Sequence, residues 1–461
     1  MNKYKKLVSN TFIFAIGTFS SKLLVFLLLP FYTRVLSNES YGVVDIIVQT
    51  CNLLIPIATV GITHAIIRFG LERRMDKQSV FTTGVLIMLG GFLVLLLFEP
   101  VMAGIPMIGE YTFYIYLFIF MSSMQGICSQ FVRAKGYVRL YAIDGVFKTI
   151  LTIVFNVLLL GVFHFGVEGY VLATILTDTI STICLTLIAR LYRYFNLKKL
   201  NVWLTRVMLK YSIPLIPNTI CTWIINISDR YMVAFLISSA ANGIYAIANK
   251  IPTILIIVSN IFGEAWQISA VSEDKRSREQ FFTQVSGVYQ SIAFLTASFL
   301  ILSAKFVTRL LASEAFYESW QYIPFLVLAT TFACLAAFLS SVYMVEKKTV
   351  ATMVTTFISA LVNIVLNLLL IPTIGVNGAA IATFISYFVM FLIRFVHTQS
   401  FIRIRWDKLR LVLNFVIILA QAVIMINEVP GWIAYESVLF LLVFVINLKD
   451  LLKTVKKMLR R

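Results

Sequence analysis

Several charged side chains lie deep inside stretches of sequence that are otherwise apolar. Asp229 and Arg230 stand side by side within WIINISDRYMVAFLI, and Lys22, Asp178 and Lys250 each interrupt another apolar stretch. An ionised side chain at the centre of a bilayer costs on the order of 3 kcal/mol even on the most permissive scale. Such residues normally face a protein interior or a wet cavity and mark a pathway, so these five define the first candidate site.

The spacing of the charges limits how they can pair. Adjacent residues on a helix point about 100° apart, so Asp229 and Arg230 cannot simply pair with each other and each needs its own partner or water. Asp144 and Lys148 have i,i+4 spacing, which predicts a structural salt bridge near a helix end, with Lys148 as an alternative cavity-lining residue. We expect Asp178 to receive Lys22 or Arg230 in one conformation.

Three prolines lie close to these charges. Pro214 and Pro217 fall early in the stretch that contains Asp229, and Pro252 follows Lys250. Proline removes a ladder hydrogen bond and kinks a helix. The prolines therefore predict bends beside the site, which are either hinges or static kinks.

The composition is that of a membrane protein. The 461 residues are 60% hydrophobic and 13% charged, with a mean hydropathy of +0.90, whereas a soluble domain averages about 25% charged residues. The first apolar stretch is too long for a cleaved signal and is expected to be retained as a spanning helix. The five cysteines are scattered singly, which argues against a disulfide framework or a metal site.

A spanning helix needs about 20 apolar residues, and fourteen such stretches occur. They are approximately residues 9–31, 43–66, 80–99, 112–132, 142–163, 168–189, 211–236, 244–268, 281–302, 322–344, 350–371, 376–396, 411–427 and 432–448. The sequence therefore predicts an all-α polytopic membrane protein with fourteen transmembrane helices.

The polar connections alternate in charge. Of the 39 Lys and Arg residues, 32 fall on one set of connections and on both termini, three on the other set, and four within spans. By the positive-inside rule both termini are cytoplasmic. The net charge of +18 is thus mainly a topology signal rather than a sign of nucleic-acid binding, although the basic tail could also contact anionic lipid heads.

The sequence contains an internal repeat. VLSNESYGVVDI parallels LISSAANGIYAI, the segment from 133 to 160 parallels VEKKTVATMVTTFISALVNIVLNLLL, and FGVEGYVLAT parallels IGVNGAAIAT. The matched residues include Ser37 with Ser238, Asn156 with Asn367, Gly166 with Gly375, and Gly169 with Gly378. Each repeat holds six spans in the same direction, and parallel repeats with a site at their interface are a transporter architecture. The repeat predicts lobes at 1–195 and 196–400, followed at 401–461 by two further helices and a basic cytoplasmic tail.

These motifs resemble a known family. VLSNESYG, its counterpart ISSAANGIYAIANKI, and the block N…LLL…PTIGVNGAAIAT are similar to the polysaccharide transporters, the oligosaccharide flippases of the multidrug/oligosaccharidyl-lipid/polysaccharide exporter superfamily. The resemblance covers residues 1–396. It implies a flippase of the bacterial cytoplasmic membrane that moves an undecaprenyl-pyrophosphate-linked oligosaccharide outward by alternating access, for surface polysaccharide biosynthesis.

The resemblance also gives the charges a role, because the helices that carry Lys22, Arg230 and Lys250 line the cavity between lobes in this family. Together they would form a cationic vestibule for pyrophosphate, since Arg grips phosphate oxygens bidentately and Lys offers a compact charge. Lys250 could instead snorkel to the headgroups.

Polar and acidic residues complete the candidate set. Gln49, Asn218, Asn226 and Asn249 could contact sugar hydroxyls or make interhelical hydrogen bonds. Asp178 and Asp229 are candidates for a charge partner or for a coupling site that binds Na⁺ or H⁺, since there is no nucleotide motif and no other cofactor is expected.

Other functions are weighed against this prediction. A lipid II flippase or a teichoic-type precursor transporter shares the expected features, whereas a drug or cation exporter would carry an acid in its first helix, where this chain has Lys22. The short outer loops argue against an enzyme. The expected partners are the lipid-linked anionic oligosaccharide, membrane lipids and the polysaccharide polymerase machinery, with the protein itself a monomer.

Overall fold

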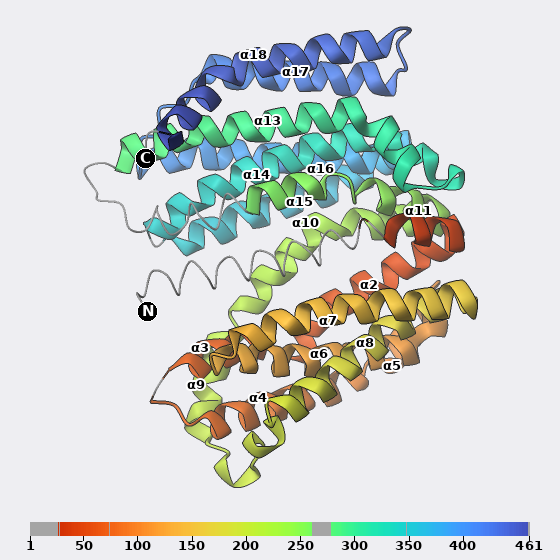
Figure 1. The fold of residues 1–461 in the computed structure, drawn as a ribbon, viewed down its shortest axis with the longest axis vertical. Helices are drawn as coiled ribbons and strands as arrows, with labels where there is room; N and C mark the ends of the chain where they lie inside the picture. The colour runs from red at the N-terminus through yellow and green to blue at the C-terminus, as the bar shows by residue number, and fades with distance from the viewer. Residues whose placement is uncertain (1–25, 27, 73, 261–277, 347, 460–461) are drawn as a thin grey trace. The chain divides into compact units, whose positions relative to one another are not determined.

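The computed structural model describes residues 26, 28–72, 74–260, 278–346 and 348–459, and within them the chain is helical without any strand (Figure 1). The chain divides into two compact units, Met1–Trp223 and Ile224–Arg461. The predicted boundaries at 195 and 400 stay a prediction. The helix α10 (Leu215–Leu236) carries the boundary between the two units.

Unit 1 consists of seven longer helices and one short helix in its described part. They are α2 (Asn38–Ala58), α3 (Ile62–Leu71), α4 (Lys77–Leu96), the short α5 (Glu99–Ala103), α6 (Thr112–Ala134), α7 (Val138–Asn156), α8 (Gly166–Ile188) and α9 (Val202–Ser212). Short turns of helix connect them: η1 (Gly109–Tyr111), the π-helical η2 (Val157–Val162), η3 (Leu191–Tyr194) and η4 (Leu197–Lys199).

Unit 2 is built from longer helices. They are α11 (Ser239–Ala248), α13 (Arg278–Leu311), α14 (Ile323–Val345), α15 (Thr349–Ile374), α16 (Val376–His397), α17 (Lys408–Ile426) and α18 (Trp432–Leu459), with η5 (Glu314–Gln321) and η6 (Thr398–Ser400) between them.

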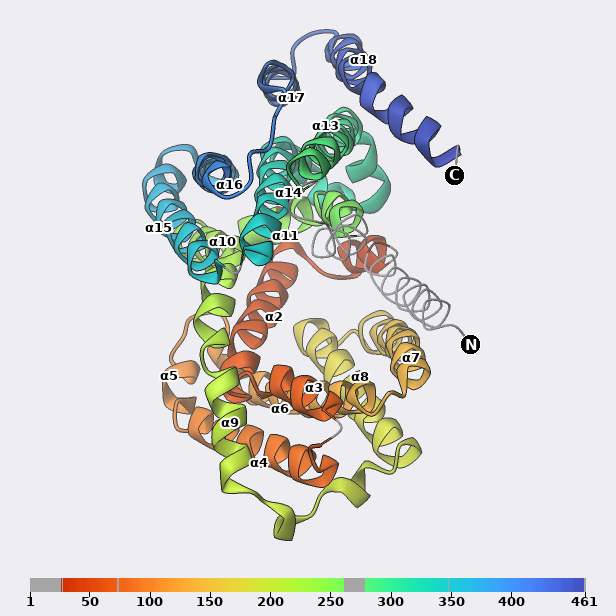
Figure 2. The same cartoon turned by 90° about the vertical axis from the view of Figure 1, so that its left-hand side faces the viewer.

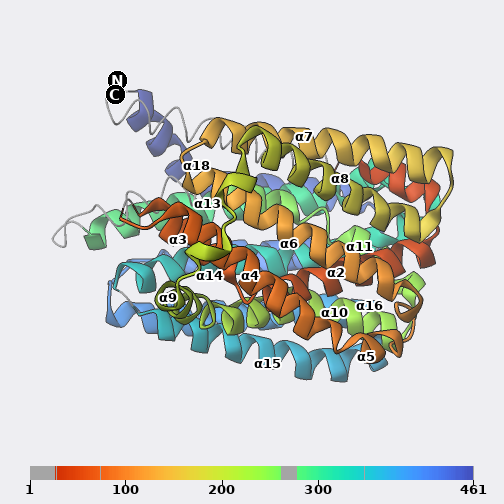
Figure 3. The same cartoon turned by 90° about the horizontal axis from the view of Figure 1, so that it is seen from below.

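In unit 1, α6 is the central helix. It packs against α8, α3, α2 and α4, and α7 packs against α8 (Figure 3). Phe131 on α6 is fully buried, and its ring lies 4.7 Å from that of Phe81 on α4 and 5.4 Å from that of Tyr194. The contacts among α6, α7 and α8 place these three helices next to one another, and the charged cluster described below lies between them.

In unit 2, α16 lies against both α14 and α15, and α13 contacts α14, α17 and α18 (Figure 2). The fully buried Phe332 on α14 is surrounded by aromatic rings from α16 and α17, among them Phe388 at 4.9 Å and Phe415 at 5.4 Å. Aromatic packing therefore joins α17 to the helices that precede it.

The predicted spans agree well with the helices. Eleven helices of the described residues are long and apolar enough to cross a membrane, and they match the predicted spans two to six and eight to thirteen. The fourteenth matches the apolar helix Trp432–Leu448, while most of the first lies outside the described residues. The all-α polytopic fold is confirmed, and the number fourteen stays a prediction.

Two helices begin earlier than predicted. The segment SNES was taken for a loop before a span at 43, but α2 begins at Asn38, and Ser37 caps it by accepting the amide of Ser40 at 3.1 Å. The repeat partner Ser238 caps α11 in the same way, accepting the amide of Ala241 at 3.1 Å. A serine at this position satisfies an amide at the helix start that has no partner within the helix.

The prolines lie at helix boundaries. Pro214 lies in the turn between α9 and α10, Pro217 in the first turn of α10, and Pro252 in the turn after α11. The predicted span 211–236 is thus interrupted, because α9 ends at Ser212 and α10 begins at Leu215. Proline is compatible with these places, where its missing N–H costs no helical hydrogen bond.

Matched glycines of the repeat have the same backbone role in both units. Gly166 and Gly375 have positive φ angles of 56° and 62° at the starts of α8 and α16. Gly169 and Gly378 lie three residues later, where a Cβ atom would come within 3.2 Å of Leu159 O and 2.4 Å of Leu370 O. The repeat thus encodes the same tight approach of consecutive helices in both units.

We therefore expect Gly378→Ala to destabilise the protein by about 1–3 kcal/mol or more, because the neighbouring backbone carbonyl must move. The matched control is Gly145→Ala on α7, where no heavy atom lies within 4 Å of the added Cβ. Thermal unfolding of the purified protein in detergent measures both. Equal unfolding midpoints for the two variants would contradict the assigned close approach.

Candidate functional site

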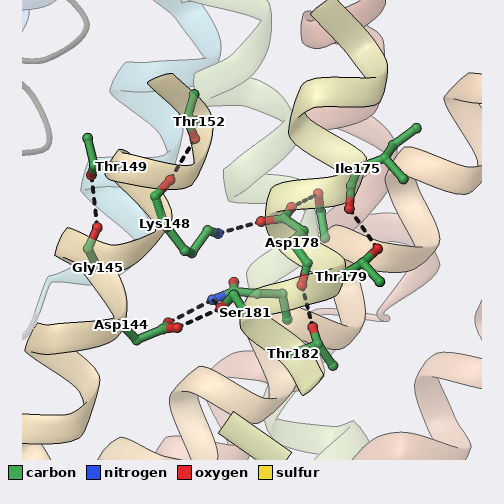
Figure 4. Close-up of polar contacts among 12 residues, drawn as sticks. Asp144, Gly145, Lys148, Thr149, Thr152, Ile175, Asp178, Thr179, Ser181 and Thr182 are labelled. Carbon is green, nitrogen blue, oxygen red and sulfur yellow. Dashed lines mark hydrogen bonds and ion pairs between the residues drawn. The ribbon is translucent and has the colours of Figure 1, made fainter. Parts of the chain in front are cut away.

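A cluster of buried charges lies between α6, α7 and α8 of unit 1 (Figure 4). Lys148 Nζ on α7 lies 2.6 Å from Asp178 Oδ1 on α8. The hydroxyl of Ser122 on α6 donates to the other carboxylate oxygen of Asp178. The salt bridge thus joins α7 to α8, and the Ser122 hydroxyl connects α6 to the same carboxylate.

The second carboxylate of this cluster, Asp144 on α7, is held by uncharged donors. Ser181 Oγ donates to Asp144 Oδ1 at 2.6 Å, and Gln125 Nε2 donates to Asp144 Oδ2 at 3.1 Å. The predicted Asp144–Lys148 salt bridge is therefore wrong. The lysine reaches across to α8 instead, because the contact between α7 and α8 brings the Asp178 carboxylate to its tip.

The charges of this cluster do not balance. Asp144 and Asp178 are only 5% and 4% exposed, and a single lysine, with 29% of its side chain exposed, lies against them. Buried ions are costly unless neutralised, so a cluster of two carboxylates and one ammonium can accommodate one further positive charge. A proton or a small cation could supply this charge, and the partly exposed Lys148 side chain makes the cluster accessible from outside the unit.

Asp229 on α10 is the centre of a second polar cluster, which lies in unit 2. Its carboxylate accepts hydrogen bonds from the hydroxyl of Tyr245 on α11 at 2.6 Å, from Thr383 Oγ1 on α16 at 3.1 Å and from the backbone amide of Arg230 at 2.9 Å. Asp229 is 1% exposed. The partners that its spacing from Arg230 required are thus supplied by two other helices.

The cluster continues through asparagines on α15. Asn363 Nδ2 donates to Thr383 Oγ1 at 3.2 Å, and Asn363 Oδ1 accepts from Asn367 Nδ2 at 2.9 Å and from Ser228 Oγ at 3.1 Å. The resulting chain runs from Asn367 through Asn363 and Thr383 to Asp229. Linked hydrogen bonds of this kind polarise one another in a low dielectric, so the four helices share one polar network.

The predicted cations differ in how deeply they are buried. Arg230 is 8% exposed on α10, so it lies packed within the protein. Lys250 is partly buried in the turn after α11. Lys22 lies outside the described residues. Asp178 forms a salt bridge with Lys148, and its expected partnership with Lys22 or Arg230 in one conformation stays a prediction.

The predicted sugar-contacting residues already take part in hydrogen bonds within the protein. Gln49 Nε2 donates to Asp45 Oδ1 at 3.3 Å, Asn249 Nδ2 donates to the carbonyl of Tyr245 at 2.9 Å, and the exposed Asn226 accepts from the hydroxyl of Tyr387. The side chain of Asn218 lies outside the described part. Sugar contact at these positions stays a prediction.

Several members of the two clusters were missed. Ser181, Gln125, Tyr245 and Thr383 are uncharged residues inside spans, and such residues are common in membrane helices. The repeat gave one available signal, because Asn156 and Asn367 match and Asn363 lies one turn before Asn367. A second signal was the TxxxN pattern of α7 (Thr152 and Asn156) and its counterpart NxxxN on α15 (Asn363 and Asn367).

The fold is shared with known transporters. The lipid II flippase MurJ in an inward closed conformation has a TM-score of 0.66 and 14% identity, and the match covers 96% of this chain and 99% of MurJ. An inward-facing multidrug resistance MATE family transporter of the MOP superfamily has a TM-score of 0.64 and 16% identity, covering 84% of this chain and 98% of the transporter. The chain is a multi-pass membrane protein with the fold of this superfamily of transporters.

A family model for polysaccharide biosynthesis proteins matches residues 7–267, which is more than half of the chain. The chain belongs to this family. No curated protein matches it. The predicted resemblance to the polysaccharide transporters and their superfamily is thereby confirmed.

The salt bridge of unit 1 leads to a prediction. Breaking a buried pair costs about 3–5 kcal/mol because the remaining charge is uncompensated, and partial exposure of Lys148 reduces this. We expect Lys148→Met to destabilise the protein by about 2–3 kcal/mol and Asp178→Asn to restore much of that loss in the double variant. The measurement is a double-mutant cycle on unfolding of the purified protein. Additive effects would show that the two side chains do not interact.

Proposed function

We propose that this protein is a flippase that moves an undecaprenyl-pyrophosphate-linked oligosaccharide outward across the bacterial cytoplasmic membrane by alternating access, supplying surface polysaccharide biosynthesis. The observation that carries the proposal is the match of residues 7–267 to the polysaccharide biosynthesis family, in a chain with the fold of MOP-superfamily transporters. Both termini are cytoplasmic in this proposal, by the distribution of Lys and Arg.

The proposed substrate is an anion with an apolar tail, and basic residues within the predicted spans would meet its charge. Lys22, Arg230 and Lys250 would hold the pyrophosphate, with the arginine fork binding oxygens bidentately. Lys148 adds a cation in unit 1 that is partly exposed and tied to Asp178. A pyrophosphate would thereby exchange its water shell for fixed ammonium and guanidinium groups while the lipid tail stays in the bilayer.

Lipid II is the second candidate substrate, and one observation favours a lipid-linked substrate over a drug. The MurJ match covers 96% of this chain and the MATE match 84%. The difference, roughly 55 residues of 461, is about the length of the segment from Lys408 to Leu459 that forms α17 and α18. The extent of this chain is therefore similar to that of the lipid II flippase.

For the energy source, we propose that Asp229 is the centre of the coupling site. The carboxylate, the hydroxyls of Tyr245 and Thr383 and the amide oxygens of Asn363 and Asn367 are hard oxygen ligands of the kind that suit Na⁺. Asn367 Oδ1 is buried without a hydrogen-bond partner in the described part of the chain, an acceptor that a cation would satisfy. Asp178 is the weaker candidate because it already holds a lysine.

The transport proposal is tested in proteoliposomes. We expect outward movement of an undecaprenyl-pyrophosphoryl oligosaccharide, with the rate reduced at least tenfold in Arg230→Ala and in Lys22→Ala and partly retained in Arg230→Lys. The matched control is Lys210→Ala, an exposed lysine on α9. Undiminished transport in both alanine variants would refute the cationic vestibule. Parallel assays with lipid II and with an organic cation separate the alternative substrates.

The coupling proposal has a readout that does not require transport. We expect Na⁺, compared with K⁺ at equal ionic strength, to raise the thermal midpoint of the wild-type protein, because a ligand that binds only the folded state stabilises it. Asp229→Asn should abolish the shift and Asp178→Asn should retain it. If the shift in the thermal midpoint survives Asp229→Asn, the ion binds elsewhere. If neither Na⁺ nor K⁺ shifts the midpoint and transport depends on pH, the coupling ion is H⁺.

A further inference from the structure

A basic pocket of about 580 Å³ opens at one end of unit 1, and its lining includes none of the residues of the two polar clusters. It lies where the segment before α4, the end of α6 and the connection from α8 to η3 come together. Lys77, Lys135, Arg190 and Arg193 line it, together with a single carboxylate, Asp76. By the proposed orientation this end of the unit is cytoplasmic.

Two of the charges are used by the fold itself. Lys77 Nζ donates to the carbonyls of Gly70 and Glu72 at 2.7 and 2.6 Å, which satisfies the end of α3. Asp76 caps α4 by accepting from the amides of Gln78 and Ser79 and from the Ser79 hydroxyl. Neither residue is therefore available as the main partner of the remaining cations.

The other three cations have no carboxylate within salt-bridge distance among the described residues. Lys135 Nζ lies 4.0 Å from the ring centre of Tyr194 and 4.6 Å from that of Tyr137, and both tyrosines line the pocket. Contact with two aromatic faces holds the ammonium in place. Arg190 and Arg193 are exposed beside it.

The backbone of η3, which carries Arg193, is held against α4 by hydrogen bonds. Gln78 Nε2 donates to the carbonyl of Arg193 at 3.0 Å, and Thr82 Oγ1 donates to the carbonyl of Tyr194 at 3.1 Å. Both bonds come from α4. The three cations are thus presented from a rigid frame, which lowers the entropic cost of binding a ligand.

The pocket borders the surface that faces lipid. Leu187 and Ile188, in the last turn of α8 just before the arginines, are exposed, as are Tyr192 in η3 and Trp203 at the start of α9. On α4, an apolar groove of about 290 Å³ is lined by Thr83, Leu86 and Ile87, roughly 9 Å further along the helix from Lys77 at 1.5 Å per residue. Aromatic residues beside basic ones are typical of the level of the lipid headgroups.

We propose that this pocket binds the phosphate headgroup of an anionic phospholipid of the surrounding bilayer. Arg190 and Arg193 can bind phosphodiester oxygens as bidentate donors and Lys135 adds a point charge, while the acyl chains lie along the exposed Leu187 and Ile188 of α8 and the apolar groove beside α4. Basic pockets beside membrane helices recognise anionic headgroups in this way. The pocket is separate from the proposed coupling and substrate residues, so its lipid does not depend on which glycan is carried.

Native mass spectrometry of the full chain in detergent tests the proposal. The ligands are phosphatidylglycerol and phosphatidylcholine with the same acyl chains, and the proteins are wild type, Lys135→Gln/Arg193→Gln and the control Arg206→Gln/Lys210→Gln. The control removes two exposed charges from α9 outside the pocket. We expect wild type to prefer phosphatidylglycerol and the pocket variant to bind it roughly thirtyfold more weakly, as the loss of two cations near a headgroup implies. The control should bind within twofold of wild type.

Three outcomes would overturn the proposal: equal binding of both lipids, equal losses in both variants, or displacement of phosphatidylglycerol by inorganic phosphate at equal concentration, which would identify a free-anion site. Thermal unfolding shows whether the pocket variant is folded. If it is not, Arg190→Gln/Arg193→Gln replaces it, since neither arginine side chain makes a salt bridge in the described part of the chain. Transport of the glycan lipid, measured separately, reports on the proposed function and not on this pocket.

Discussion

The constraint on which the rest of this structure depends is that a charge inside the bilayer must be paired or hydrogen-bonded within the protein. In unit 1, Lys148 and Asp178 meet this constraint across the contact of α7 with α8. In unit 2, Asp229 meets it with hydrogen bonds from α11 and α16. Because apolar side chains gain little from leaving lipid for one another, such polar contacts between helices contribute both to packing and to its specificity. The residues that we assign to function are therefore also residues that hold the helices together.

The repeat shows that the two units solve the same packing problem with different charges. The serine caps of α2 and α11 and the glycines at the starts of α8 and α16 are equivalent in position and in geometry. At the repeat offsets, however, Lys148 and Asp178 correspond to Ser359 and Tyr387, so unit 2 has no equivalent of this salt bridge at these positions. The contact of α15 with α16 is made instead by the Ser359 hydroxyl and by Arg394, which donates to Thr355 and Thr356. The buried carboxylate Asp229 lies on α10. A duplicated scaffold thus carries two unlike polar clusters. Such a difference is needed if an anionic ligand and a coupling ion bind to different residues.

Much of the fold could be predicted from the sequence because hydrophobic length and loop charge are local properties. Eleven spans matched helices of the described residues, and the repeat identified glycines whose roles the backbone confirms. The starts of α2 and α11 were missed for a local reason as well. Polar residues such as those around Ser37 and Ser238 suit both a loop and a capped first turn, and the difference depends on whether the serine accepts an amide of the helix.

The pairing of the charges could not be predicted, because it depends on which helix faces which. Asp144 lies one turn from Lys148 and seemed its natural partner at i,i+4, a contact worth only about 0.2–0.5 kcal/mol in a helix. Across the interface, Asp178 offers a carboxylate that is desolvated and also bound by Ser122, where the attraction is stronger because the local dielectric is lower. The longer-range contact therefore prevails, and Asp144 is satisfied by Ser181 and Gln125 instead. Pairing by sequence distance fails here because a lysine side chain is long enough to reach a neighbouring helix. Both carboxylates are buried, so the partner is decided by which carboxylate the helix packing places at the tip of Lys148.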